Sequence, residues 1–478
     1  MAKKNKKKKN YINNKKFKKK QKKERNEYIQ KFKDTIIAHK DSIWRPKLNV
    51  KYENIKTDSC FDILNHTSNN NSNTIHDIKT NNIFPEEMKK CFKVKIYPNE
   101  LQKTILFKWF DAYIDMYNAT LSLIKDNYKN GNKAILNYKK LRTEYLKDIK
   151  CKISGKSQME DNNYNTKIVS HSLDAAIKLA CANYKSAFSN YKSGRMKKLF
   201  RVRYWKKNKP TKIVCIEPSY INQNSICHKI FGKFEVEDIE INNKKFELND
   251  IKQIYKSEFR MLYDKDTNEF VLHIPCTIKP KKKTTIIKEN MVSLDPGIRT
   301  FMTGISDNST IKIGTNISGK IKQKLNRLDK IKGNDKISTK IKKKNEEIIN
   351  RKISNMVDEM HWKTLNYLTN KYKNILIGDM SVKGIINNET SKLSKMTKRI
   401  GNALKFYQFR ERLKFKCNMY KIGHKIVDEK YTTKMCSNCG HIDNYLGASK
   451  IYKCKQCGME IDRDVNGSRC IYIKGNYM

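Results

Sequence analysis

The chain has 478 residues, enough for two or more compact units with a substantial core. It carries 102 Lys and Arg against 48 Asp and Glu, a formal net charge of +54. Such self-repulsion indicates a polyanionic partner, although an AT-rich genome also raises the lysine content. A membrane protein is disfavoured, because the sequence has no run of 18 apolar residues and no apolar signal core.

Four of the thirteen cysteines are grouped, whereas the other nine are scattered along the chain, which indicates a reducing compartment. The grouped residues form two Cys-x2-Cys pairs separated by fourteen residues, and a glycine follows each pair. Two such turns can close a tetrahedral zinc site, and four thiolates leave no position open for catalysis. We therefore predict a structural zinc ribbon, with redox cysteines as the alternative. The zinc ligands would be Cys436, Cys439, Cys454 and Cys457.

Residues 1–88 combine a lysine-rich block at 1–33 with a polar stretch that includes the Asn-rich segment 66–74. Neither part has enough apolar side chains to bury, so we predict a disordered basic tail followed by a linker. The lysine block is typical of a nuclear-localisation signal and of a non-specific nucleic-acid arm, and the sequence does not choose between them.

Regular structure is predicted from residue 89 onward. Alternating apolar residues at 92–97 indicate a strand with a basic face, which Pro98 ends and after which Asn99 can cap a helix. Helical periodicity marks two helices within 100–210, and short alternating segments within 211–285 indicate strands. We expect the strand at 92–97 to join this later sheet.

Cations and aromatic residues interleave in the segment 195–209. This pattern suits contact with unpaired nucleotides, because bases stack on aromatic rings while cations hold the phosphates. A solvated strand with core-facing aromatic residues is the alternative. The candidate nucleic-acid-binding residues in this segment are Arg195, Arg201, Arg203, Tyr204 and Trp205.

The segment 291–304 places one carboxylate at the end of a predicted buried strand. Residues 291–294 form that strand, Asp295 ends it, and a Pro-Gly turn leads to a returning strand at 301–305. A buried acid is costly unless it is paired or binds a metal. Asp-Pro-Gly is also an ordinary turn sequence, so the residues alone leave both readings open.

Helices and strands alternate in the rest of the chain. Residues 318–373 are mostly helical, and an apolar strand at 374–380 follows them. A helix at about 400–422 then leads to a strand at 423–429 that ends in acids. This order of elements is that of an RNase H-like mixed α/β core.

Four segments resemble the RuvC motifs and zinc ribbon of TnpB proteins, namely 295–299, 375–384, 431–440 and 462–466. Residues 93–98, with Gln102, Tyr117 and Asn118, are similar to the N-terminal strand and first helix of that family. TnpB proteins are transposon-encoded, RNA-guided nucleases. The resemblance spans residues 90–478.

The resemblance implies a multidomain α/β fold with an RNase H-like (RuvC) nuclease core. A wedge β-barrel would comprise 89–99 and 211–285, and an inserted helical recognition domain would comprise 100–210. The nuclease core would comprise 286–430 and a final segment at 461–478, on either side of the zinc ribbon at 431–460.

One position departs from the family pattern. The second RuvC strand of TnpB ends in a catalytic glutamate, and the matching residue here is Gly378. Asp379 alternates to the opposite face of the strand and is a poor replacement. Glu429 ends the neighbouring strand, about 4.8 Å away, so its side chain can reach the same place. A solvated strand-end acid is the alternative for Glu429.

A glutamate at position 429, with the usual one lost, resembles the eukaryotic and viral relatives called Fanzors. The expected source is therefore a eukaryote or a large DNA virus, and the expected location is the nucleus of a eukaryotic cell. A prokaryotic source would place the protein in the cytoplasm.

The resemblance implies that Asp295, Glu429 and Asp464 bind two Mg²⁺ or Mn²⁺ ions and cleave guide-matched double-stranded DNA. A guide RNA encoded by the element would be the second partner, and no membrane partner is expected. Arg299 would either steer phosphate or form a structural ion pair. A catalytically inactive RNA-guided DNA-binding protein and a transposase that joins strands remain alternatives.

Overall fold

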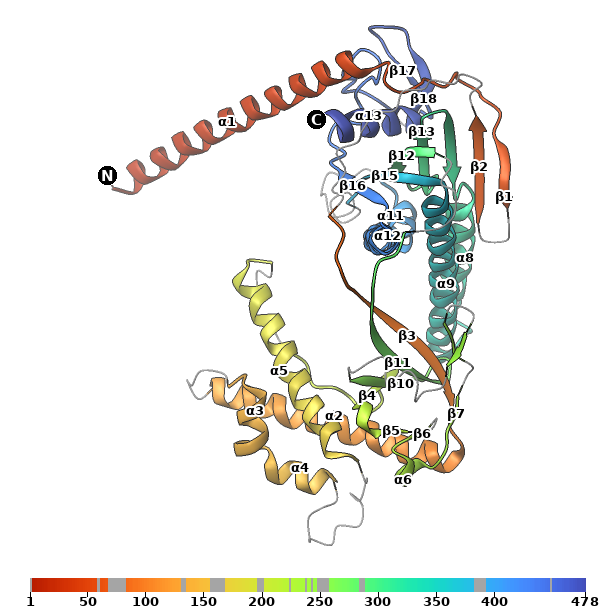
Figure 1. Cartoon of the computed structure of the whole chain (residues 1–478). Coiled ribbons are helices and arrows are strands. Elements are labelled where there is room, and N and C mark those ends of the chain that lie inside the picture. Colours follow the sequence, from red (N-terminus) through yellow and green to blue (C-terminus); the bar gives the residue numbers. More distant parts are fainter. Residues whose placement is uncertain are drawn as a thin grey trace. The chain divides into compact units, whose positions relative to one another are not determined.

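The computed structural model describes residues 2–57, 61–67, 83–129, 135–154, 168–195, 202–222, 225–236, 239–241, 244–246, 258–282, 289–381, 393–447 and 449–478. These residues form two compact units (Figure 1). Unit 1 comprises Met1–Glu86 and Lys279–Met478, and unit 2 comprises Glu87–Ile278. Within the described part of the chain, no helix combines the length and the apolar character that a membrane span requires.

A seven-stranded mixed sheet is the centre of unit 1, in the order β1-β2-β14-β13-β12-β15-β16. Its strands are β1 (Glu53–Thr57), β2 (Asp62–Thr67), β12 (Glu289–Pro296), β13 (Met302–Ser306), β14 (Ser309–Ile313), β15 (Tyr372–Gly378) and β16 (Gly423–Val427). The strands β12, β13 and β14 form an antiparallel meander, and β15 and β16 run parallel to β12. The five strands from β14 to β16 therefore fit the expected RuvC-type α/β fold.

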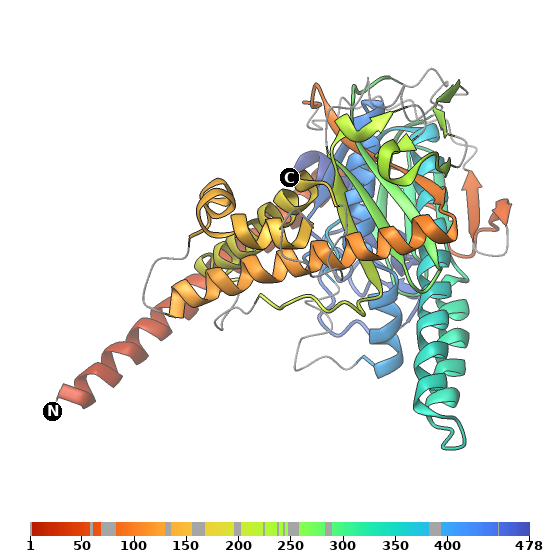
Figure 2. The same cartoon turned by 90° about the horizontal axis from the view of Figure 1, so that it is seen from below.

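Helices cover both faces of this sheet, which explains why β12 and β15 are apolar on both sides. One face packs against α8 (Ile317–Lys332), α9 (Thr339–Lys371), α11 (Lys395–Ala403) and α12 (Phe406–Tyr420). The other face packs against α13 (Arg463–Tyr477). Along β12, Val292 enters the first core and Met291 the second. Figure 2 shows α8 and α9 lying side by side.

Two parts of the N-terminal segment, one helix and the strand β2, have regular structure that the sequence does not predict. A long helix, α1, spans Ala2–His39, and its last part brings Phe32 and Ile36 into the same core as α13. The strand β2 pairs with β14 and so extends the central sheet. The prediction of a disordered tail and linker is therefore wrong for the end of α1 and for β2, because a few apolar residues suffice to dock a lysine-rich segment. Most of the Asn-rich segment lies outside the described residues.

A five-stranded antiparallel sheet in the order β4-β10-β11-β3-β7 is the centre of unit 2. Its strands are β3 (Met88–Tyr97), β4 (Thr211–Ile216), β7 (Glu235–Val236), β10 (Phe259–Asp264) and β11 (Glu269–Ile278). The early strand β3 pairs with the late strand β11, as expected. Two further strand pairs are β5 (Ile221–Asn222) with β6 (Ser225–Ile226), and β8 (Ile239–Ile241) with β9 (Lys244–Phe246). The described pairs form an open sheet, and its closure into a wedge barrel stays a prediction.

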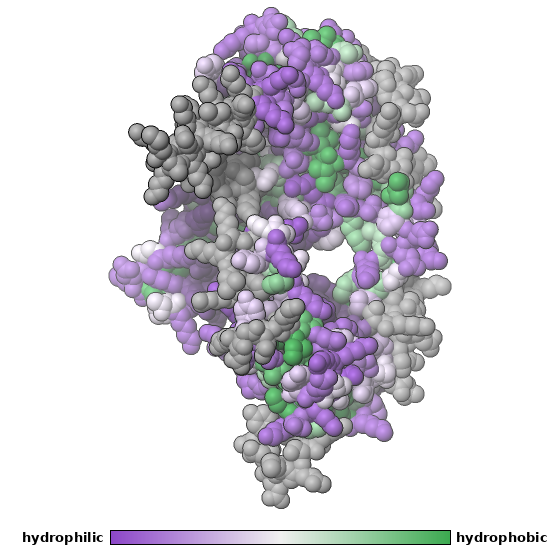
Figure 3. Space-filling model, turned by 90° about the vertical axis from the view of Figure 1, so that its left-hand side faces the viewer, coloured by the Kyte–Doolittle hydropathy of each residue, from purple (hydrophilic) through white to green (hydrophobic). Residues whose placement is uncertain are grey.

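The helices of unit 2 include the two that the sequence predicts, α2 (Glu100–Lys129) and α5 (Ser170–Lys192), which pack on each other. Asn99 caps α2, since its Oδ1 accepts the backbone N–H of Gln102 at 2.9 Å and Gln102 Oε1 accepts that of Asn99. Shorter helical segments are α3 (Tyr138–Lys140), η1 (Leu141–Tyr145), α4 (Lys147–Ser154), η3 (Pro218–Tyr220) and α6 (His228–Phe231). Hydrophilic residues cover much of the face shown in Figure 3, consistent with the large net charge.

Truncations at the N-terminus distinguish the docked part of α1 from the rest of the helix. Removal of residues 1–24 should leave the unfolding temperature of unit 1 unchanged, because the core contacts that the structure describes for α1 begin at Ile29. Removal of residues 1–44 should lower it, since burial of Phe32, Ile36 and Ile43 stabilises the fold by about 2 kcal/mol for each side chain. Differential scanning calorimetry measures the difference. Equal unfolding temperatures for the two truncations would contradict the docking.

Candidate active site

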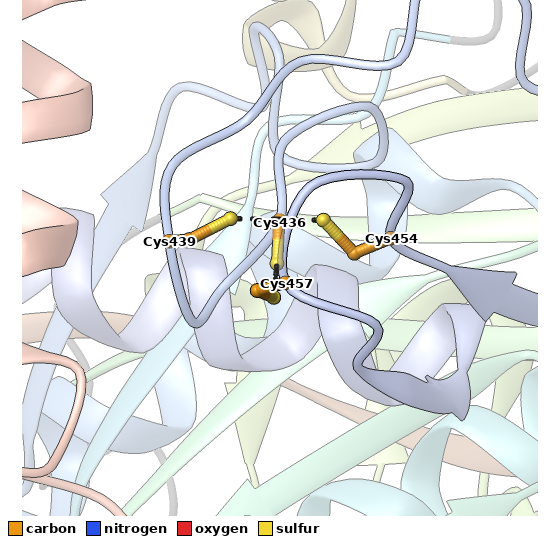
Figure 4. A group of neighbouring side chains, drawn as sticks. All are labelled: Cys436, Cys439, Cys454 and Cys457. Atoms are coloured by element: carbon orange, nitrogen blue, oxygen red, sulfur yellow. Dashed lines mark hydrogen bonds between the residues drawn. The ribbon is translucent and has the colours of Figure 1, made fainter.

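The four grouped cysteines lie together beside the N-terminal end of α13 (Figure 4). The Sγ atoms of Cys436 and Cys457 are 3.7 Å apart, and those of Cys439 and Cys454 are 3.6 Å apart. Four sulfurs at 2.3 Å from a central zinc ion would be separated by about 3.8 Å, so the cluster has the size of a tetrahedral zinc site. These cysteines can therefore bind zinc, as predicted from their spacing.

Each cysteine pair lies in a tight turn that a glycine closes. The backbone N–H of Gly440 donates to the carbonyl of Cys436 at 2.9 Å, and that of Gly458 donates to the carbonyl of Cys454 at 3.1 Å. Both glycines have φ near +70°, a conformation that is unfavourable for residues with a Cβ atom. The glycines are therefore required for the two ligand turns.

A buried asparagine connects this ribbon to α13. The Asn466 side chain accepts the backbone N–H of Ser437 at 3.0 Å and donates to the carbonyl of Met435 at 2.8 Å. Asn466 is completely buried, and its hydrogen bonds fix the first ligand turn relative to α13. The position of the zinc ribbon is thus coupled to that of the first turn of α13, which carries Asp464.

Strand alternation directs Asp295 toward α13. Met291 and Ser293 of β12 face this helix, and the Ser293 hydroxyl donates to the carbonyl of Ser468 at 2.8 Å. Asp295 comes two residues after Ser293, and because side chains alternate between the two faces of a strand, it also faces α13. Its carboxylate lies against Gly467, where an added Cβ atom would be only 2.5 Å from Asp295 Oδ2. The absence of a side chain at residue 467 therefore makes room for the Asp295 carboxylate.

Glu429 lies on the same side of the sheet, over the end of β15. A Cβ atom added to Gly378 would be 1.9 Å from Glu429 Oε1 and 2.7 Å from its Cδ. The Glu429 carboxylate thus fills the space in which a side chain at residue 378 would begin. Its Oε1 also accepts the backbone N–H of Met380 at 3.1 Å.

The third acid, Asp464, lies in the first turn of α13. The preceding Asp462 caps this helix, since its side chain accepts the backbone N–H groups of Asp464 and Val465 at 2.9 and 3.3 Å. Lys312 of β14 donates to Asp462 at 2.8 Å. A carboxylate in the first turn of a helix is favoured by the helix dipole, so the start of α13 suits Asp464.

Electrostatic interactions connect Asp295 with both Glu429 and Asp464. Burial, with the charges of Glu429 and Asp464, holds the pKa of Asp295 well above its ordinary value. Burial raises the pKa of Glu429 to about 7. Burial and the charge of Asp462 also raise the pKa of Asp464, against the opposing charges of Arg463, Lys312 and Arg299. Raised pKa values in one cluster of acids are typical of functional sites.

The three carboxylates are farther apart than the ligands that surround a single metal ion. Among the described residues, only the four cysteines form a group of three or more His, Cys, Asp or Glu ligand atoms that all lie within 4.8 Å of one another. The three acids do not form a group this compact, and their hard oxygen atoms are of the kind that Mg²⁺ or Mn²⁺ prefers.

Sequence reasoning missed several residues that shape this site. The backbone N–H of Glu429 donates to Asp379 Oδ1 at 3.0 Å, so the acid on the opposite face holds the Glu429 backbone. Arg410 of α12 donates to the carbonyl of Met380 at 2.7 Å, and its charge opposes the raised pKa of Glu429. Gly467 was not singled out either, because its role depends on how closely α13 approaches β12.

The candidate nucleic-acid contacts divide into two groups. Arg195, Arg203 and Tyr204 are exposed, as is Arg299 near the acids, whereas Arg201 lies outside the described residues. Trp205 instead stacks on Tyr117 with 4.3 Å between ring centroids, and its backbone exchanges two hydrogen bonds with the Asn118 side chain. The Lys209 ammonium is 3.8 Å from the Trp205 ring centroid. Trp205 therefore has the core-facing packing that the sequence left as an alternative.

Comparisons with known proteins show to which family the chain belongs. The family model described as "Cas12f1-like, TNB domain" matches residues 406–471, and one described as "Helix-turn-helix domain" matches residues 88–133. TnpB-like protein L770 of Acanthamoeba polyphaga mimivirus is 32% identical over 484 residues, which cover 93% of this chain and 89% of that protein. The chain belongs to the TnpB-like family. The viral relative agrees with the expected large-virus or eukaryotic source, and a nuclear location stays a prediction.

The first matched region of this TnpB-like chain contains Glu429, the four cysteines and Asp464. The second contains β3 and α2, which here are a strand followed by one long helix. Over 70 residues, 14% of this chain and 16% of the relative, the chain is 36% identical to the CRISPR-associated endodeoxyribonuclease Cas12f1 of Sulfoacidibacillus thermotolerans. A cryo-EM structure of a Cas12f1–sgRNA–target DNA complex has a TM-score of 0.38 at 15% identity, covering 81% of this chain and 99% of the Cas12f1 chain.

Zinc analysis tests the cysteine site of the TnpB-like chain. We expect one zinc ion per purified chain by mass spectrometry, and its loss in a Cys439→Ser variant, because three sulfurs no longer close the tetrahedron. Unit 1 should then unfold at a lower temperature. A Cys91→Ser variant is the control, since Cys91 is exposed and lies outside the cluster. A metal-free wild-type protein with four reactive thiols at these positions would contradict the prediction.

Raising the pH should destabilise unit 1 when no Mg²⁺ or Mn²⁺ is added. The pKa of Glu429 is raised from 4.5 to about 7, so between these values the folded chain keeps a proton that the unfolded chain has released. The resulting stabilisation is complete below the lower value and is lost as the pH rises through the upper one. Urea unfolding at several pH values measures the loss. A Glu429→Gln variant should show a weaker pH dependence, and an unchanged dependence would contradict the assignment.

Proposed function

We propose that this chain is an RNA-guided DNA endonuclease of the TnpB type, in which Asp295, Glu429 and Asp464 form the hydrolytic site. The contact between Gly378 and Glu429 is the observation that carries the proposal. The family's usual glutamate would extend from residue 378, and the Glu429 carboxylate fills the space where that side chain would begin. The loss of the usual glutamate at residue 378, together with the gain of Glu429, is therefore compatible with a complete set of three acids, as in the Fanzor-type relatives.

The three acids fit a pair of divalent cations by charge and by ligand type. Burial raises the pKa of each acid, and the charges of Glu429 and Asp464 further raise that of Asp295. Bound cations would offset both effects, and carboxylate oxygens are preferred ligands of Mg²⁺ and Mn²⁺. When bound, such cations lower the pKa of an attacking water and stabilise the leaving oxygen of a phosphodiester. Arg299 is exposed near Asp464, where its positive charge would orient the phosphate.

A guide RNA and double-stranded target DNA are the proposed partners. The excess of Lys and Arg supports binding of a polyanion, and the family resemblance implies an RNA–DNA hybrid that is read by its shape and backbone. The exposed cations Arg195 and Arg203, with Tyr204, would contact nucleic acid from unit 2. RNA that co-purifies with the chain should therefore have a defined sequence rather than a random one.

Substitution of Gly378 tests the site with a matched control. A Gly378→Ala variant should cleave guide-matched DNA much more slowly than the wild type, because the new Cβ atom overlaps Glu429 Oε1. Gly319→Ala in α8 is the control, since a Cβ atom there meets nothing within 4 Å. Glu429→Ala should slow cleavage by more than about a hundredfold, the upper range for residues that only support metal ligands. Single-turnover cleavage of DNA by the guide-loaded chain in Mg²⁺ measures all three.

A double variant that exchanges the residues at positions 378 and 429 tests the same site by a recovery of activity, which a merely damaged fold could not produce. The double variant Gly378→Glu with Glu429→Gly should cleave faster than Glu429→Gly alone, because it returns the carboxylate to the family's usual position. Wild-type cleavage that is unaffected by Glu429→Ala would refute the assignment of Glu429. Tight guide-dependent DNA binding by the wild type with no cleavage in Mg²⁺ or Mn²⁺ would instead support an inactive DNA-binding protein.

A further inference from the structure

The last part of α1 and the turn after it are bound to the C-terminal part of unit 1. We call residues 25–44 the docking segment. In Figure 1 the C-terminal end of α1 lies beside α13, and the two helices are in contact. Trp44 donates to the carbonyl of Ser306 at 3.0 Å, and His39 stacks on Tyr477 with 3.7 Å between ring centroids. The segment therefore belongs to the fold of unit 1.

A buried arginine fixes the end of this segment. Arg469 of α13 is 1% exposed, and its Nη2 donates to the carbonyls of Lys40 and Ile43 at 2.8 and 3.1 Å. Its Nη1 donates to the Ser437 hydroxyl at 2.8 Å, in the first zinc-ligand turn. The buried guanidinium joins the end of the docking segment, the first zinc-ligand turn and α13, because loss of either partner segment would leave buried N–H groups without acceptors.

At its other end, the docking segment contacts the residue that precedes Glu429. The Tyr28 hydroxyl donates to Asp428 Oδ2 at 3.0 Å. The buried Lys474 ammonium of α13 donates to the same oxygen at 3.4 Å and also to the backbone carbonyl of Asp428. The rings of Tyr28 and Phe32 lie 5.0 and 5.2 Å from this ammonium group. Tyr28 and Lys474 thus hold Asp428 from two elements.

The backbone around Glu429 is fixed on its other sides by residues close to it. Its N–H donates to Asp379, and its carbonyl accepts the N–H and the hydroxyl of Thr432 at 3.2 and 2.9 Å. The hydrogen bond from Tyr28 to Asp428, in contrast, joins two segments that are 400 residues apart in the chain. Tyr28 therefore couples the docking segment to the loop 428–432.

We propose that Tyr28 is a positioning residue for Glu429, and that the docking segment is part of the nuclease site rather than only a nucleic-acid arm. This inference rests on the proposed function, because it assigns the role of Glu429 in cleavage. Tyr28 holds Asp428, and Asp428 sets the direction from which the Glu429 side chain enters the space over Gly378. A loop released from Tyr28 would let the carboxylate move away from Asp295 and Asp464.

A Tyr28→Phe variant of the full guide-loaded chain tests the proposal, because it removes only the hydroxyl. We expect the single-turnover cleavage rate to fall about tenfold, the effect of one lost hydrogen bond to a charged group, with little change in the DNA concentration that gives half the maximal rate. Hydrogen–deuterium exchange without Mg²⁺ is the second measurement, and residues 428–432 should exchange faster. Gln30→Ala is the control, since Gln30 bonds only Asp34 on the exposed side of α1.

Two results would overturn the positioning role. One is an unchanged cleavage rate with unchanged exchange at 428–432 in Tyr28→Phe. The other is a lower unfolding temperature without an effect on either measurement, which would assign Tyr28 to docking alone. Failure of the proposed function is a separate outcome, recognised when Glu429→Ala cleaves as fast as the wild type.

Discussion

Three acidic side chains are largely buried at one end of the central sheet of unit 1, and the cost of burying them is the constraint that the surrounding structure has to meet. Asp295, Glu429 and Asp464 arrive from a strand, a loop and a helix, and each has a raised pKa in which burial is the first cause. Two glycines, Gly378 and Gly467, give the carboxylates their space. The helix dipole and nearby cations lower the cost, and bound divalent cations would offset the rest.

Much of this arrangement follows from short-range patterns. The alternation along β12 and β15, the Asn cap of α2 and the spacing of the four cysteines each depend on neighbours within a few residues, so the sequence predicts them directly. Predicting the position of Glu429 also requires that β15 and β16 be adjacent and parallel. This arrangement is available from the order of elements in an RNase H-like core, and the structure agrees with it.

Other features depend on contacts between distant segments and could not be read from local patterns. The apolar residues that dock α1 are few among its many lysines, so they form no clear pattern in the sequence. The strand β2 joins the sheet by pairing with β14, which is distant in the chain. Gly467 shows no signal of its role until the approach of α13 to β12 is known. Trp205 lies in a segment whose composition suits contact with nucleic acid, yet Tyr117 and Asn118 hold it against the core of unit 2. The three-dimensional partners of these residues, rather than their identities, decide what they do.

The split of unit 1 along the chain has a consequence for its biosynthesis. Unit 2 is continuous, from Glu87 to Ile278, and all its residues leave the ribosome before β12 is made. Unit 1 is completed only with α13, which carries Asp464 and covers one face of the sheet. Since domains fold as they emerge, unit 2 can fold before the three acids of unit 1 come together, because α13 supplies Asp464 after all the strands of the central sheet. The order of segments thus makes the assembly of the acid cluster depend on the prior synthesis of α13.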